Sequence, residues 1–213
     1  MNGTFISFEG TEGGGKSTQI QLLAERLRAE GRVVRVLREP GGTSIGEEIR
    51  HTLKHSASNH AMTAEAELLL MNASRAQLVR EVIRPALAAG EIVLCDRFFD
   101  STIAYQGYGR QLDLNQVRSI IDFAVGTTRP NLTLLLEVSV ETSEARRQSR
   151  QTITGPERDR MEEADRAFFE RVHLGYFEIA RTDPDRVRVI DASEGIHHVA
   201  TTIWRQVSTV IYG

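Results

Sequence analysis

The chain has few of the features that mark secreted, membrane-spanning or nucleic-acid-binding proteins. Its 213 residues include one cysteine, Cys95, which excludes an intrachain disulfide and fits a reducing compartment. No apolar run approaches the roughly 18 residues of a membrane span, and the first residues, MNGTFISFEG, lack the pattern of a signal peptide. The net charge is −3, whereas nucleic-acid-binding domains are usually basic. These absences predict a cytoplasmic protein that binds neither membrane nor nucleic acid.

Internal repeats and low-complexity segments are also missing, and the length fits a single domain spanning residues 1–213. Apolar segments of strand length alternate with segments of helical periodicity. Because strands that are apolar throughout are covered on both faces, the pattern predicts a three-layer α/β fold with a five-stranded parallel sheet. The strands are expected at 5–8, 33–37, 92–95, 132–138 and 187–190, and the main helices near 20–27, 63–88, 113–125, 162–181 and 196–211.

The stretch GTEGGGKST follows the first expected strand directly and precedes an amphipathic helix. It satisfies the phosphate-loop pattern, in which glycines let successive backbone N–H groups point at a polyphosphate. Lys16 is expected to reach the β- and γ-phosphates, and the Ser17 hydroxyl to ligate Mg²⁺. The sequence therefore predicts a P-loop NTPase fold. The expected nucleotide-binding residues are Gly10, Thr11, Glu12, Gly13, Gly14, Gly15, Lys16, Ser17 and Thr18.

Three classes of P-loop protein compete at this point. A switch GTPase would carry an Asn-Lys-x-Asp motif, which the sequence lacks, and an ATP-driven motor would usually end its strand in adjacent acids. Here the third strand is followed by Asp96 and Arg97. An Arg in this place suits holding phosphates during transfer, and a surface ion pair is the less favoured alternative beside a phosphate loop. The pattern favours a small-molecule kinase.

A polar stretch with a Gly-Pro pair, QSRQTITGPERDR at 148–160, interrupts the regular alternation. We expect it to be irregular and to form a mobile surface lid. It is rich in arginine, which is also typical of a solvated helix end.

Six motifs together resemble the bacterial thymidylate kinase family along nearly the whole chain. REPGG together with AYQG separates this family from adenylate, guanylate and uridylate kinases. The resemblance implies transfer of the γ-phosphoryl group of ATP, with Mg²⁺, to thymidine monophosphate (dTMP), giving the diphosphate for dTTP synthesis and DNA replication. It also implies a homodimer formed through helices such as 63–88. The motifs are FEGTEGGGKST (8–18), REPGGT (38–43), ELLLMNASRAQLV (67–79), LCDRFFDSTIAYQGYGR (94–110), RPNLTLLLEV (129–138) and ERDRMEEADRAFFERV (157–172).

The resemblance also implies an acceptor site. Arg50 matches the residue that pairs with the acceptor phosphate, Arg75 the one that hydrogen-bonds thymine, and Met71 stands where many relatives carry a stacking Phe. Met is a looser platform for an aromatic base than Phe. Ser101 and Gln106 match polar thymine contacts, and Tyr105 the sugar side. The full expected set is Glu12, Glu39, Pro40, Arg50, Met71, Arg75, Arg97, Ser101, Tyr105 and Gln106.

For catalysis, the resemblance points to Lys16 and Arg97 together with a lid arginine. Loop positions 11–14 carry no basic residue, so the remaining positive charge is expected from Arg150 or Arg160. Ser17 and Asp96 are expected to hold Mg²⁺. Three alternatives stay open: a deoxynucleoside kinase, a kinase for another monophosphate, and a non-enzymatic nucleotide-binding module.

Overall fold

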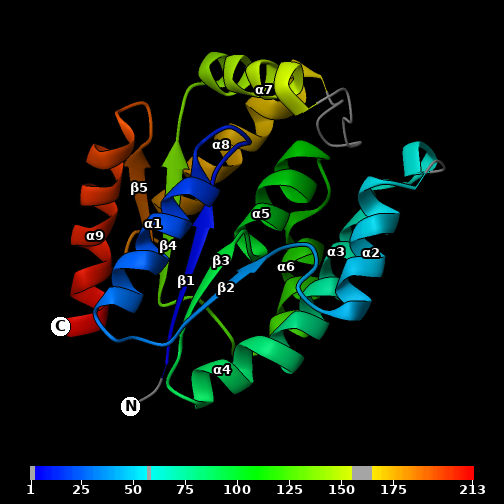
Figure 1. Cartoon of the computed structure of the whole chain (residues 1–213). Helices are drawn as coiled ribbons and strands as arrows, with labels where there is room; N and C mark the ends of the chain where they lie inside the picture. Colours follow the sequence, from blue (N-terminus) through cyan, green and yellow to red (C-terminus); the bar gives the residue numbers. More distant parts are fainter. Residues whose placement is uncertain (1–2, 57–58, 155–164) are drawn as a thin grey trace.

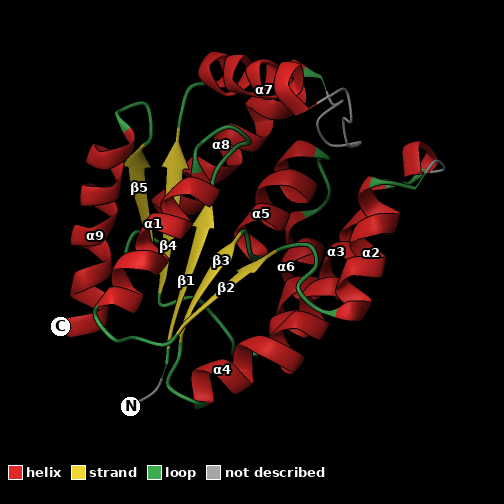
Figure 2. Cartoon of the chain, viewed as in Figure 1, coloured by secondary structure: helices red, strands yellow, loops and turns green. Residues whose placement is uncertain are grey.

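A computed structural model describes residues 3–56, 59–154 and 165–213, with only the backbone described at 147, 148 and 150–154. Its centre is a parallel sheet in the order β2-β3-β1-β4-β5 (Figure 2). This confirms the predicted five-stranded sheet and its three-layer arrangement. The strands are β1 (Thr4–Glu9), β2 (Val34–Arg38), β3 (Ile92–Asp96), β4 (Leu132–Glu137) and β5 (Val187–Asp191).

Helices cover both faces of the sheet (Figure 1). Ile6 and Phe8 of β1 pack with α1 (Lys16–Ala29) and α9 (Ile196–Tyr212). Phe5 points to the opposite face, which α3 (Ala64–Leu78), α6 (Leu114–Val125) and α8 (Arg166–Thr182) cover. Because side chains alternate along a strand, Glu9 at the end of β1 also faces this second layer.

The segment predicted as one helix over 63–88 is a continuous helical run of three parts. These are α3 (Ala64–Leu78), a π-helical turn η2 (Val79–Ile83) and α4 (Arg84–Ala88). The π turn ends at Ile83, two residues before Pro85, which has no N–H to donate to the preceding turn. The remaining elements are α2 (Ser44–Lys54), η1 (Asn59–Ala61), α5 (Phe99–Thr102) and the π-helical η3 (Ile103–Gly109).

The prediction of an irregular segment over 148–160 was wrong for its first half. Helix α7 (Val140–Thr154) continues through residues 148–154. These residues contain no helix breaker, and the first Gly and Pro stand at 155 and 156. The rest of the expected lid lies outside the described residues.

Within the described ranges, no helix combines the length and the apolar character that crossing a membrane requires.

Candidate active site

The loop between β1 and α1 takes a conformation that only glycine accommodates at its start. Gly10 has φ +127°, and a Cβ there would lie 2.3 Å from the carbonyl oxygen of Leu136 in β4. Gly15 has φ +84° and precedes the first turn of α1, where no side chain caps the helix. The loop therefore presents backbone N–H groups and the positive end of the helix dipole, as an anion site requires.

Lys16 lies folded over this loop. Its Nζ donates to the carbonyl oxygens of Gly10 (3.1 Å) and Thr11 (2.9 Å), and the side chain is buried. The pKa of Lys16 is lowered from 10.5 to about 8, mainly because the side chain is buried and secondly because the charge of Arg97 lies nearby. A polyphosphate in the loop would place negative charge beside this ammonium and stabilise its charged form.

The residues expected at the metal lie side by side. The Ser17 hydroxyl donates to Oδ2 of Asp96, at the end of β3, over 2.8 Å. Hydroxyl and carboxylate oxygens are ligands that Mg²⁺ prefers, so this pair fits the ion. Among the residues the structure describes, no group of three or more acidic, His or Cys side chains could hold a metal. Most ligands would have to come from phosphates and water, which is usual for Mg²⁺.

Arg97 has an unusual backbone conformation for a non-glycine residue, with φ 72°. Its N–H donates to the Phe8 carbonyl oxygen over 2.9 Å, which ties β3 to β1. Its guanidinium donates to Gly10 of the phosphate loop (3.0 Å), to the Tyr176 hydroxyl (3.2 Å) and to the Tyr105 hydroxyl (3.3 Å). The left-handed conformation thus turns this cation toward the loop.

Glu9, which was not among the residues predicted from the sequence, lies beneath this arrangement. The carboxylate accepts hydrogen bonds from the Phe98 N–H (2.7 Å), the Ser101 hydroxyl and the Tyr176 hydroxyl (3.0 Å). Burial, together with the charge of Asp100, raises its pKa from 4.5 to about 7. An acid at the end of an apolar strand beside a phosphate loop was the signal available for Glu9. Tyr176 lies 167 positions away, and its contact with Glu9 is visible only in the fold.

Two adjoining cavities open around Arg97. One, of about 1200 Å³, is lined by the phosphate loop and by Arg50, Lys54 and Asp96. The other, of about 450 Å³, is lined by residues from five segments of the chain. Every expected acceptor residue lines one or both: Arg50 the first cavity, Glu12, Glu39 and Arg97 both, and Pro40, Met71, Arg75, Ser101, Tyr105 and Gln106 the second.

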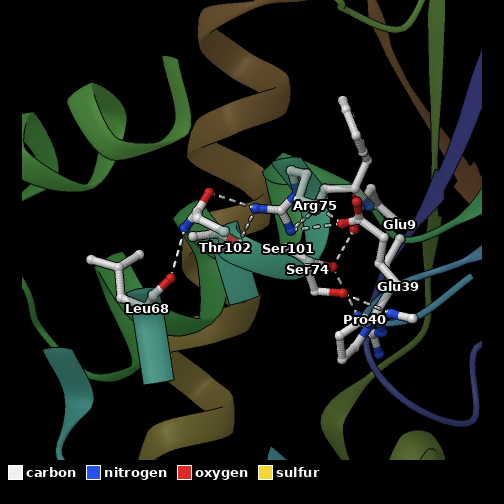
Figure 3. A network of polar contacts seen from close by, with 12 residues as sticks. Glu9, Glu39, Pro40, Leu68, Ser74, Arg75, Ser101 and Thr102 are labelled. Carbon is white, nitrogen blue, oxygen red and sulfur yellow. Dashed lines mark hydrogen bonds and ion pairs between the residues drawn. The ribbon is translucent and has the colours of Figure 1, made fainter. Parts of the chain in front are cut away.

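Arg75 is the centre of a buried polar network in the second cavity (Figure 3). Its Nε donates to Glu39 (2.8 Å), one terminal nitrogen to Asn72 and Thr102 (2.9 Å each), and the other to the Phe98 carbonyl oxygen (3.2 Å). All three nitrogens therefore contact protein oxygens. Burial raises the pKa of Glu39, while Arg75 opposes this shift.

The loop after β2 is held from several sides. The N–H of Gly41 donates to the Ser74 hydroxyl of α3 over 3.0 Å. Glu47 accepts from the N–H of Gly42 over 2.8 Å, and this backbone hydrogen bond lowers its pKa. Arg50 donates to the Pro40 carbonyl oxygen over 2.8 Å, so its guanidinium lies at the edge of the phosphate-side cavity.

Two of the expected catalytic residues are not placed. The side chain of Arg150, in α7, and all of Arg160 lie outside the described residues. An earlier arginine of the same helix, Arg146, donates to the carbonyl oxygens of Gly13 (3.1 Å) and Ala192 (3.3 Å). It joins the phosphate loop to the segment after β5. This role of Arg146 was not predicted from the sequence.

Comparisons with known proteins agree with this geometry. The family model described as thymidylate kinase matches residues 8–203. The chain is 47% identical over 208 residues to a thymidylate kinase of Syntrophotalea carbinolica, covering 97% of this chain and 96% of that protein. It is 48% identical over 196 residues to one of an Exiguobacterium species, covering 92% and 90%. A crystal structure of thymidylate kinase from Ehrlichia chaffeensis is similar at a TM-score of 0.75 and 31% identity, covering 97% of this chain and 99% of that one.

Proposed function

The chain belongs to the thymidylate kinase family, and we propose that it transfers the γ-phosphoryl group of ATP to dTMP, giving dTDP and ADP. The observation that carries this proposal is the pair of adjoining cavities that share Glu12, Glu39, Lys54 and Arg97. One is built around a phosphate loop and the other around hydrogen-bonding side chains. A donor and an acceptor can thus meet at Arg97, as in-line transfer requires.

The phosphate loop and Lys16 hold ATP in this proposal, and Ser17 and Asp96 hold Mg²⁺. The ion supplies charge neutralisation at the transferring phosphoryl group. Arg97 bridges the phosphates of donor and acceptor, and its contacts with Gly10, Tyr105 and Tyr176 fix its position before substrates bind. No general base is needed, because the acceptor is already a phosphate anion.

The acceptor lies with its phosphate toward Arg50 and Arg97 and its base in the second cavity. Arg75 exchanges one of its protein contacts for a carbonyl oxygen of thymine, and Gln106 binds the same edge of the base. Met71 packs against the ring. The Tyr105 ring closes the sugar side, and Glu12, 3.9 Å from Arg97, approaches the sugar from the loop.

Helices α2, α3 and α6 form a homodimer interface in this proposal. They pack beside one another and expose large apolar side chains: Ile45 is 52% exposed, Leu69 56% and Phe123 85%. Leu68, Leu78, Val79 and Ile83 of the 63–88 run are buried within the chain, so they cannot contact a second copy. The buried, unpaired Cys95 is consistent with a cytoplasmic location.

An acceptor panel tests the proposed reaction. ADP release is measured with dTMP, dUMP, UMP and thymidine as acceptors. We expect kcat/KM to be highest with dTMP. Faster turnover with thymidine would indicate a nucleoside kinase, faster turnover with UMP another monophosphate kinase, and no acceptor-dependent ADP release a binding module.

A further inference from the structure

Gln106 lies in the wall of the second cavity with a fixed neighbour behind it. Its side chain is 1% exposed, and its Nε2 donates to Oε1 of Glu67 in α3 over 2.8 Å. Glu67 is equally buried. Its two carboxylate oxygens accept a two-pronged contact from Arg110, from Nε over 3.2 Å and from the terminal nitrogen over 3.0 Å.

This arrangement determines which way round the Gln106 amide lies. A carboxylate paired with a guanidinium only accepts hydrogen bonds, so the amide must turn its NH₂ group toward Glu67. The opposite orientation would place the carbonyl oxygen of Gln106 against a carboxylate oxygen, which is repulsive. No described residue donates a hydrogen bond to Oε1 of Gln106. This oxygen is therefore available as an acceptor on the side of the cavity.

An acceptor in this wall discriminates between pyrimidines. A 4-oxo pyrimidine such as thymine carries a hydrogen on N3 and can donate to Oε1. In a 4-amino pyrimidine such as cytosine, N3 is an acceptor and would face Oε1 without a hydrogen. Sites that hydrogen-bond one substrate reject an analogue whose groups leave buried partners unpaired.

We infer that Glu67, held by Arg110, is a positioning residue that locks Gln106 as an acceptor and selects 4-oxo over 4-amino pyrimidine monophosphates. The inference rests on the proposed function, because it takes the second cavity as the base site. Glu67 itself lies behind Gln106 and acts only through it.

Glu67→Gln tests the lock with little change in shape. A glutamine can accept or donate at this place, so the Gln106 amide is free to turn over. We expect the ratio of kcat/KM for dTMP to that for dCMP to fall about tenfold, on the scale of one hydrogen bond. Arg110→Lys, which keeps the charge but loses the two-pronged contact, should change the ratio in the same direction by less.

Two further variants distinguish an effect of Glu67 on the position of Gln106 from a non-specific effect of the substitution on the protein. Glu81→Gln is the matched control, because Glu81 also accepts from a glutamine, Gln77, over 2.7 Å, but on the surface. It should leave the ratio unchanged. In a Gln106→Ala background, Glu67→Gln should have no further effect on the ratio, since the residue it positions is gone.

The outcomes are distinct. An unchanged ratio in Glu67→Gln, or an equal loss with and without Gln106, would overturn the inference while leaving the proposed reaction intact. If the unaltered chain fails to phosphorylate dTMP at all, the proposed function and the inference both fall.

Discussion

Arg97 is the residue on which the proposed transfer depends most, because it lines both cavities and is held in place before substrate arrives. Arg97→Ala should lower kcat at least about 10²-fold, the scale of losing one preorganised charge contact. Steady-state kinetics with saturating ATP and dTMP measures this. Arg35→Ala, which removes an exposed cation paired with Glu91, is the control and should turn over normally. Near-normal turnover of Arg97→Ala would refute the role.

Glu9 gives a pH dependence whose sign can be worked out. Its pKa is about 7 in the folded chain and 4.5 for the unperturbed group. Between these values the unfolded chain releases a proton that the folded chain retains, so the free energy of unfolding falls as pH rises. The contribution of protonated Glu9 to the free energy of unfolding is complete below the pKa of the unfolded chain, 4.5. It is lost once the pH has risen past the pKa of the folded chain, about 7.

Glu9→Gln removes this titration while keeping hydrogen-bonding groups in place. Its free energy of unfolding, measured in urea across this pH range, should fall less with rising pH than that of the unaltered chain. Glu65→Gln, in the exposed first turn of α3, should keep the original slope. Identical slopes for Glu9→Gln and the unaltered chain would contradict the burial argument.

At the scale of elements, the sheet and most helices were predictable from the sequence. The spacing of apolar residues and the length of each apolar run determine these elements locally. The five strands and the phosphate loop follow from runs such as Phe5–Phe8 and from the glycine pattern. The extension of α7 was missed because polar composition was taken as a sign of irregularity, although no helix breaker stands before Gly155.

The candidate site was predictable where motifs carry it and not where the fold assembles it. Arg97, Arg75 and Gln106 stand in motifs. The contacts of Glu9 with Tyr176 and of Gln106 with Glu67 join segments far apart in the chain. Neither the periodicity of apolar residues nor the spacing within motifs predicts contacts between residues so far apart in the sequence.

Two arginines, Arg150 in α7 and Arg160 beyond it in the sequence, lead to a prediction of their own. The phosphate loop has no arginine at positions 11–14, and we predict that a lid arginine supplies the remaining positive charge. Of Arg150→Ala and Arg160→Ala, at least one should lower kcat by about 10³-fold, while the KM for dTMP changes little. Arg181→Ala, exposed on α8 and paired with Glu178, is the control. Turnover within a few-fold of normal in both lid variants would exclude this role.

At the scale of the whole molecule, the apolar side chains on α2, α3 and α6 predict the oligomeric state. Phe123→Glu should convert the proposed homodimer to a monomer, because it places a charge in the proposed apolar contact. Light scattering after size-exclusion chromatography measures the mass. Leu174→Glu, an equally drastic change at a 55% exposed leucine on α8, should leave the dimer intact. A monomer before any substitution would contradict the assignment of this face.

The destination of the phosphoryl group tests the central claim most directly. The chain is incubated with Mg²⁺, dTMP and ATP labelled in the γ-phosphate, and the products are separated. We predict that the label appears in dTDP in equal amount to the ADP formed, and that Lys16→Ala abolishes this transfer. Label found only in inorganic phosphate, with dTMP unchanged, would contradict the account.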